Sequence, residues 1–385
     1  MGVNIIERTA PASNGSLTDT GKLFVVGAIG SGSQTAPTLI QSISDFEAAF
    51  TTRTGAAIPA WDYLDTFFRE GGNQAYVLDY ATAGETNAAA ALDLIPATLG
   101  PGQVAVIGEA PGAAMYGALQ AHADANNRIA LLDVASTDNT AALLATEGAF
   151  AQALTSKENV GLFGSWVNVP APTGVVGGSA RTVPASAVIA ALCNRVDQQI
   201  GANGIANYNQ PAGGKSFPLQ FATGFVFDPT TSADQTTVKS AACNFFHDAW
   251  GTLENYSFLT PLYTGTPITT TPFWQLNCSR ARMWLKAQAQ VLGEKYYMKD
   301  IDGQGKLAAQ LAADLSDLCY KLWQAGGLYG ETSADAYSVN VGVSINNNGT
   351  AATGTLNAEV DARFSQYADT VNITLVSVPL TGTVL

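Results

Sequence analysis

Residues 102–135, GQVAVIGEAPGAAMYGALQAHADANNRIALLDVA, decide the fold class. Two short apolar runs, at 102–110 and 128–135, flank an alanine-rich segment at 115–126 that has helical character. A buried strand, a helix and a second buried strand in this order form the unit from which parallel sheets with covering helices are built. The stretch therefore predicts an α/β fold.

The alternation of helix and strand extends over an α/β middle domain, which we assign to residues 88–268. Helical segments are expected at its start, before about residue 155 and after Pro184. Further strands are expected at 159–170 and 219–227, and the segment between 200 and 225 is expected to be largely loop.

A smaller unit precedes this domain. A strand is expected at 22–30, a short helix capped by Ser44 or Asp45, a helix that Gly71 and Gly72 end, and a strand near 74–81. The pattern predicts a strand, helix, helix, strand unit, which we assign to residues 21–87.

The character of the sequence changes after about residue 268. Residues 279–298 and 305–327 both predict amphipathic helices, the second with Leu307, Leu311, Leu315, Leu318 and Leu322 along one face. Asp302 is placed near the cap of the second helix, and alternating strands follow around a polar turn. We assign residues 269–370 to a C-terminal α+β domain with two long helices and a small sheet. Residues 1–20 and 371–385 are assigned as extended arms.

The stretch QPAGGKS at 210–216 resembles a phosphate-binding loop only in its last residues. Such a loop requires a glycine where this chain has Asn209, and it opens a helix in which Pro218 would be costly. The glycines at 27, 30 and 32 likewise miss the dinucleotide-binding spacing. Both stretches are therefore interpreted as structural loops.

The composition indicates an assembly subunit. Only 13% of the 385 residues are charged, 38 are glycine, and the net charge is −13. A surface so poor in charge favours contact with other copies, and the acidic balance argues against a nucleic-acid partner. We expect no secretory signal, because Glu7 and Arg8 lie near the start and no apolar core follows, and no lipid attachment, because Ile6 stands where a serine or threonine is required. The longest apolar run is too short to span a bilayer, so we expect no membrane insertion and synthesis in the cytosol.

The residues that catalysis or metal binding needs are scarce. The chain has two histidines, His122 and His247, and four separate cysteines at 193, 243, 278 and 319. His122 is expected on the polar side of its helix, and His247 to be partly buried among aromatic residues. No nucleophile-elbow motif or clustered metal ligands occur, so we expect no catalytic, cofactor or metal site and no enzymatic activity.

Basic residues are concentrated in the first C-terminal helix. Residues 280–321 carry seven basic and five acidic side chains, a net charge of +2, so the rest of the chain carries −15. One hypothesis is that this basic helix docks on an acidic partner. The alternative is that the basic residues belong to an ordinary solvated helix face, because they lie on one side of the helix only if it bends at Gly293. The residues concerned are Arg280, Arg282, Lys286 and Lys295.

In order along the chain, these segments resemble the tail sheath proteins of contractile phage tails and related injection machines. The resemblance rests on GVNIIERTAP at 2–11, FVVGAIGSGSQTAPTLIQSISDFEAAF at 24–50, WDYLDTFFREGGNQAYVLDY at 61–80, VPASAVIAALCNRVDQQIG at 183–201, NQPAGGK at 209–215, FWQLNCSRARMWLKAQAQVLGEKYYM at 273–298, and the segments 318–330 and 336–342. The chain departs from the family pattern at Arg280-Ala281-Arg282, at 183–186 and at Asp79. We therefore do not assign to this chain the individual salt bridges between subunits that the family has.

The resemblance implies a structural role without cofactors. It implies hexameric rings stacked helically around an inner tail tube protein, contraction that drives the tube through a cell envelope, and baseplate and tail terminator proteins as partners. The middle domain would have a subtilisin-like fold that lacks the catalytic residues. The protein would be located in a virion tail or an injection particle that is made in the cytoplasm of the host bacterium.

The resemblance also gives the two arms a function. They would add as strands to sheets of neighbouring copies. The residues expected to exchange in this way are Val3, Ile5, Ile6, Val371, Ile373, Leu375 and Val376. The basic helix would face the tube. Two alternatives remain at this point: a non-contractile tube or shell protein, and a degenerate α/β hydrolase.

Overall fold

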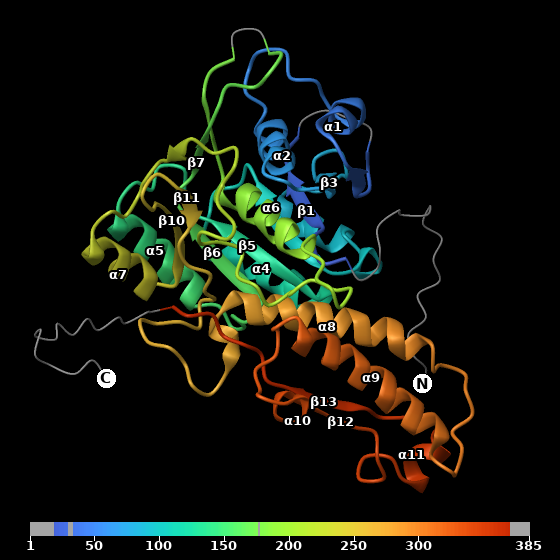
Figure 1. Ribbon diagram of the computed structural model, residues 1–385. Coiled ribbons are helices and arrows are strands. Elements are labelled where there is room, and N and C mark those ends of the chain that lie inside the picture. Colours follow the sequence, from blue (N-terminus) through green and yellow to red (C-terminus); the bar gives the residue numbers. More distant parts are fainter. Residues whose placement is uncertain (1–18, 30–33, 176–177, 370–385) are drawn as a thin grey trace, which may run out of the picture.

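The computed structural model describes residues 19–29, 34–175 and 178–369 (Figure 1). Its centre is an eight-stranded sheet in the order β11-β10-β6-β5-β4-β1-β3-β2. The six inner strands are parallel, and the two edge strands β2 and β11 are antiparallel to their neighbours. In sequence order the strands are β1 Leu23–Gly27, β2 Thr38–Ile40, β3 Ala75–Asp79, β4 Gly102–Ile107, β5 Arg128–Asp133, β6 Val160–Gly164, β10 Cys243–Asp248 and β11 Leu253–Asn255. The expected parallel α/β sheet is present.

The pairing of strand β1 shows that the sheet continues across the domain boundary expected at residue 87. It pairs in parallel with β3 on one side and with β4 on the other, so the predicted units 21–87 and 88–268 share one sheet. The sequence suggests two units because two helices separate β1 from β3, whereas one helix lies between β4 and β5 and one between β5 and β6. Pairing between strands, which sequence periodicity does not report, joins the two segments.

Two layers of helices cover the sheet. Phe24 and Val26 of β1 belong to one core, and Leu23 and Val25 to the other, because successive strand side chains point to opposite faces. The first core is closed by α3 Ala88–Ala91, α4 Ala113–Asn126, α5 Ala141–Gln152 and α7 Ser232–Ser240. The second is closed by α1 Ile43–Ala49, α2 Pro59–Arg69, α6 Ala185–Asp197 and the first half of α8 Leu276–Glu294. Short 3₁₀ turns lie at η1 Leu92–Leu94, η2 Ala97–Leu99 and η3 Pro272–Trp274.

Two local expectations differ from the structure. Helix α1 is capped by Ser42, whose Oγ accepts from the Asp45 amide at 3.2 Å, and not by Ser44 or Asp45. The strand expected at 159–170 is divided at Ser165, whose φ of 70° turns the chain. The second half, β7 Val167–Val169, joins β8 Arg181–Val183 and β9 Gly224–Phe225 in a small antiparallel sheet. β9 is all that forms of the strand expected at 219–227.

The QPAGGKS loop runs along the outer edge of β11. Gly214 N–H donates to the Asn255 carbonyl at 2.8 Å, and Leu219 N–H donates to the Leu253 carbonyl at 2.8 Å. A Cβ on Gly213 would lie 2.5 Å from the Asn255 carbonyl oxygen, so only glycine allows this approach. The loop covers an exposed sheet edge, which is a structural role.

The C-terminal unit lies beneath the sheet in Figure 1, with α9 packed along α8. Its remaining elements are α9 Lys306–Gln324, α10 Ser333–Ala336, β12 Tyr337–Asn340, α11 Asn348–Ala352 and β13 Glu359–Ala362. Four of the five predicted leucines of α9 are buried, and Leu318 is partly buried against Trp284 and Leu322. Asp302 accepts from the amides of Lys306 and Leu307, which confirms its predicted place at the start of this helix.

Glu70 joins the second helix to the loop that follows the QPAGGKS stretch. This side chain is fully buried, and its two oxygens accept from the amides of Gln220, Phe221 and Ala222 at 2.8, 2.8 and 2.9 Å. Charge-assisted bonds of this kind are about twice as strong as neutral ones. Glu70 therefore fixes a segment that has little secondary structure of its own.

We predict that Glu70→Gln lowers the free energy of unfolding by about 2 to 3 kcal/mol, because the amide nitrogen cannot accept a backbone hydrogen bond. Urea unfolding of the purified chain measures the loss. Glu294→Gln, at the exposed end of α8, is the matched control and should change stability by about 0.5 kcal/mol or less. A similar small change at both positions would show that Glu70 does not anchor the loop.

Candidate assembly surfaces

Helix α8 joins the C-terminal unit to the sheet. Its first half is buried, and Arg280, 1% exposed, forms an ion pair with Asp197 of α6 at 2.7 Å. The same guanidinium donates to the Cys193 carbonyl at 3.1 Å, and Thr20 donates to Asp197 at 2.7 Å. Burial opposes the charged form of Arg280, but the adjacent Asp197 carboxylate offsets it and raises the arginine pKa.

The other basic residues of the predicted helix occupy different surroundings. Arg282 pairs with Glu158, donates to Asn159 Oδ1 at 2.9 Å, and stacks over Phe273 at 3.9 Å. Lys295 pairs with Asp314 at 2.6 Å. Lys286 is exposed.

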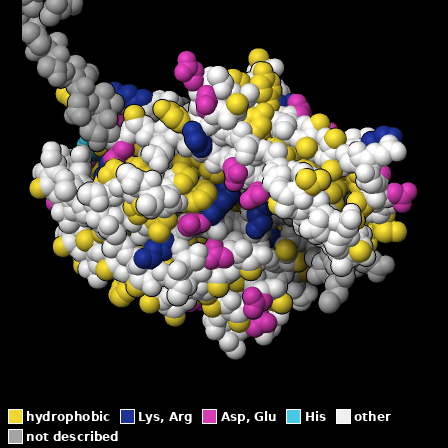
Figure 2. All heavy atoms as spheres, turned by 90° about the horizontal axis from the view of Figure 1, so that it is seen from below, with side chains coloured by type: hydrophobic (Ala, Val, Ile, Leu, Met, Phe, Trp, Pro, Cys, Tyr) yellow, Lys and Arg dark blue, Asp and Glu magenta, His cyan; other side chains and the backbone are white. Residues whose placement is uncertain are grey.

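These contacts correct the expected basic surface. Arg280 cannot face a tube, because its guanidinium lies inside the subunit. Carboxylates of the same chain pair with Arg282 and with the exposed Lys295, so that among the described contacts Lys286 is the one of the four cations without an ion pair. Figure 2 shows the molecule from below with few charged side chains, and acidic and basic groups are interspersed on that face. The positive charge counted in the sequence is therefore largely internal or paired.

The residues predicted for strand exchange lie outside the described part of the chain. They are Val3, Ile5 and Ile6 in the first segment and Val371, Ile373, Leu375 and Val376 in the last. A sheet edge that suits such strands is described, however. Strands β12 and β13 form an antiparallel ribbon of two strands, packed on α9 through Val360. Two-stranded ribbons are marginally stable alone and gain from an added strand.

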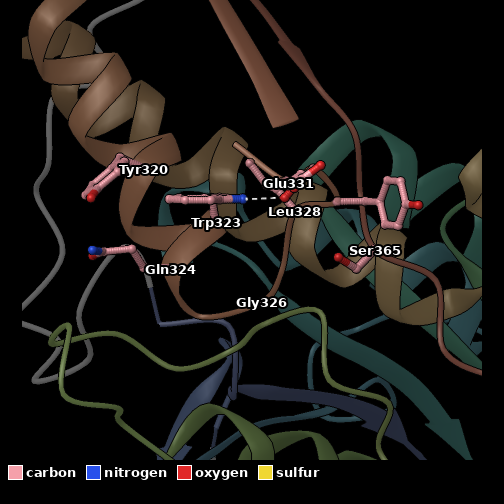
Figure 3. Close-up of a pocket in the computed structure, with 9 residues that line it drawn as sticks. Tyr320, Trp323, Gln324, Gly326, Leu328, Glu331 and Ser365 are labelled. Atoms are coloured by element: carbon pink, nitrogen blue, oxygen red, sulfur yellow. Dashed lines mark hydrogen bonds between the residues drawn. The ribbon is translucent and has the colours of Figure 1, made fainter. Parts of the chain in front are cut away.

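An aromatic hollow lies where α9 ends. It measures about 910 Å³ and is lined by nine residues, among them Tyr320, Trp323, Leu328, Tyr329 and Glu331 (Figure 3). Trp323 is held in place because its Nε1–H donates to the Gly330 carbonyl at 3.0 Å. Tyr329 is 70% exposed and its amide donates to the Arg363 carbonyl at 2.7 Å. The hollow is an open depression at the surface, and its lining is slightly more apolar than polar.

A buried polar cluster lies at the start of α6. Asp133 accepts from the amide and hydroxyl of Ser186 at 2.8 and 2.5 Å, and Tyr63 lies 2.8 Å from the same hydroxyl. Burial raises the pKa of Asp133 to about 7. Tyr63 and Ser186 are fully buried, so a substrate has no access to this serine. The carboxyl group stabilises the start of α6, where the first-turn amides need acceptors.

Both histidines have partners other than a serine. His122 is 5% exposed, and its Nε2 accepts from Arg128 at 2.7 Å, so its expected place on the polar side of the helix is wrong. The helix side it occupies is covered by Arg128, which also donates to the Pro96 carbonyl at 2.7 Å. His247, partly buried as expected, pairs with Asp228 at 2.6 Å. Within residues 19–29, 34–175 and 178–369, no group of three or more potential metal ligands occurs.

Nearly the whole chain aligns with solved structures of contractile sheaths. The helical sheath of the anti-feeding prophage in its contracted state matches with a TM-score of 0.70 and 19% identity, over 97% of this chain and 98% of that one. The contracted sheath complex of the extracellular contractile injection system PVC matches with a TM-score of 0.69 and 15% identity, over 98% of both chains. The chain has the fold of contractile sheath proteins.

A sheath tail protein from Desulfitobacterium hafniense shares this sheath fold less closely. Its TM-score is 0.56 at 10% identity, over 88% of this chain and 93% of that one. No family model and no curated protein matches the sequence. None of the helices in the described ranges combines the length and apolar character needed to cross a membrane. The resemblance predicted from sequence is thus confirmed at the level of the fold.

We predict that Arg280→Ala lowers the free energy of unfolding by about 3 to 5 kcal/mol, because it leaves Asp197 buried without its cation. The double variant Arg280→Met with Asp197→Leu should be more stable than Arg280→Ala, since it removes both charges. Denaturant unfolding of the single and double variants measures the coupling. Equal losses in both would contradict a buried ion pair.

We predict acid sensitivity from His122. Burial, and then the neighbouring Arg128 charge, lower its pKa to about 4. The unfolded chain, with a histidine pKa of about 6.5, therefore binds a proton that the native state excludes between these values. Stability should fall as the pH drops from about 6.5 to about 4, by up to about 1.4 kcal/mol per unit. His122→Gln keeps an acceptor for Arg128 and should remove this slope in thermal unfolding measured across the window; an unchanged slope would exclude His122 as its origin.

Proposed function

We propose that this chain is the structural subunit of a contractile tail sheath, stacked as hexameric rings around an inner tail tube. The observation that carries the proposal is the extent of the structural match, which spans 97 to 98% of this chain and 98% of the sheath proteins. The match includes the C-terminal unit as well as the α/β sheet, so it concerns more than a common sheet architecture. A subtilisin-like description of the middle domain belongs to this proposal, as does the absence of catalysis.

The proposed assembly uses backbone pairing between copies. Residues of the first and last segments, about 18 and 16 residues outside the described ranges, would add as strands to the β12–β13 ribbon of neighbouring copies. Main-chain hydrogen bonds do not depend on side-chain charge, which suits a chain with only 13% charged residues. Such links persist while subunits rotate as rigid bodies.

Contraction in this proposal needs no nucleotide or metal. Subunits assembled in an extended, metastable lattice would move to a packing of lower free energy, and the tube would be driven through a cell envelope. The baseplate and a tail terminator would hold the two ends. The particle would be a virion tail or an injection device made in a bacterial cytoplasm.

Electron microscopy of the purified full-length chain tests the proposal. We expect helical tubes of stacked rings with an axial repeat that shortens under mild urea or acid. Tubes whose repeat never changes would favour a non-contractile tube protein instead. A protein that stays monomeric under every condition would contradict the proposal.

We predict that deleting residues 1–15 leaves a folded and soluble subunit that no longer polymerises. The deletion removes Val3, Ile5 and Ile6 and leaves every described residue in place. Sedimentation velocity and circular dichroism distinguish loss of assembly from loss of folding. Normal tubes from the truncated chain would show that the first arm does not link copies.

Of the predicted contact between the first C-terminal helix and an acidic tube, we retain only a contribution of Lys286, which a substitution tests. Because Arg280, Arg282 and Lys295 have partners within the chain, Lys286→Glu changes the exposed charge without breaking an ion pair of the subunit. It should weaken co-assembly with the tube protein more at low salt than at high salt. Lys306→Glu, an exposed lysine at the start of α9, is the control. Equal co-assembly of both variants and the parent chain would discard the contact.

A further inference from the structure

The tip of the β10–β11 hairpin carries an unusual residue. Ala249 N–H donates to the Thr252 carbonyl at 2.9 Å, so Trp250 and Gly251 form a two-residue turn. Their φ angles are 62° and 80°, and a turn with both angles positive favours Asn-Gly. A tryptophan in the first position adopts a backbone conformation that is unfavourable for a bulky side chain. Nothing in the turn itself requires an indole.

The indole also makes almost no contact with its own chain. Trp250 is 96% exposed, more than any other large apolar side chain among the described residues. Aromatic side chains bury roughly 150 to 250 Å² when they are enclosed, and tryptophan is enriched at the centres of interfaces. Gly251 N–H donates to Asp248 Oδ1 at 2.7 Å, so the turn that presents the indole is well fixed. We call this hairpin tip, residues 249–252, the knob.

The aromatic hollow at the end of α9 has the matching chemistry. Its wall offers the rings of Tyr320, Trp323 and Tyr329, and Glu331 is the charged residue among the nine that line it. Figure 3 shows Trp323 and Tyr320 side by side with Trp323 bonded to the 326–331 loop. At about 910 Å³ the hollow is as large as pockets that take up a drug-sized molecule, and because it is open to solvent it is accessible to a side chain of another molecule.

Knob and hollow lie on different parts of one chain. The hairpin belongs to the end of the eight-stranded sheet, and the hollow belongs to the C-terminal unit below it (Figure 1). The high exposure of Trp250 shows that it does not fill the hollow of its own chain. A contact between unlike surfaces of identical chains leaves one knob and one hollow free at the ends, so it propagates into a ring or a helix.

We propose that Trp250 of one copy inserts into the aromatic hollow of a second copy of this chain. The inference rests on the proposed sheath function and names a side-chain contact within that assembly. It is independent of the arms, because all residues involved lie in the described ranges. The partner is a second copy because the same chain presents both the exposed indole and an aromatic hollow with one charged lining residue, which the described residues leave open.

Cross-linking between copies tests the contact directly. Thr252→Cys places a thiol beside the knob, and Glu331→Cys places one at the hollow, while the four native cysteines are buried. Assembled particles from a mixture of the two singly substituted chains, treated with a short bis-maleimide, should yield covalent dimers. Each chain alone should yield at least tenfold less. Particles that form without dimers in the mixture would overturn the inference and leave the proposed function standing.

A substitution at the knob gives the second arm of the test. Trp250→Asn suits the turn, so the unfolding midpoint should stay equal or rise, whereas assembly should weaken at least tenfold in critical concentration. Trp250→Phe should restore assembly in part. Met298→Asn is the matched control, since Met298 is 85% exposed and has a φ of 59° at another site. Unchanged assembly of Trp250→Asn would overturn the inference, and a parent chain that never assembles would overturn both proposals.

Discussion

The parallel pairing of β1 with β3 and β4 is the constraint on which the structure depends. All five residues of β1 are buried, and the side chains of its first four residues belong in alternation to two different cores. A parallel sheet of this kind must be covered on both faces. One face is covered by α3, α4, α5 and α7, and the other by α1, α2 and α6 with α8 against them. The position of the C-terminal unit therefore follows from the covering of the sheet.

The junction between α6 and α8 shows how a charge-poor protein uses the charges it has. Arg280 and Asp197 are paired in the interior, Arg181 joins Asp62 and Asp65 in another buried cluster, and Arg128 holds backbone carbonyls and His122. Buried arginines with several partners fix the relative placement of elements, since unpaired charges in the interior are costly. Much of the positive charge is thus used within the subunit, whereas the contacts proposed between copies use backbone edges and apolar side chains.

The structural matches extend over nearly the whole chain although identities lie between 10 and 19%. The fold requires local sequence patterns. These are apolar runs of strand length, helices with one apolar side, and glycines where the backbone adopts a positive φ or another strand approaches closely. Many sequences satisfy these requirements. Individual surface residues are under no such restriction, so the shared fold assigns no individual contact between copies.

The sequence by itself determined the elements and the fold class. The βαβ rhythm at 102–135, Pro184 before α6, Asp302 before α9 and the leucine face of α9 are all local patterns, and the structure contains each of them. Only the tertiary structure decided that 21–87 and 88–268 share a sheet, that His122 is buried, and that Arg280 faces inward. Those outcomes depend on partners far along the chain: Arg280 meets Asp197, 83 residues away, and Gly214 meets Asn255. A periodic pattern shows which side of a helix is apolar, but it does not show which distant carboxylate, carbonyl or strand edge folding will bring to the other side.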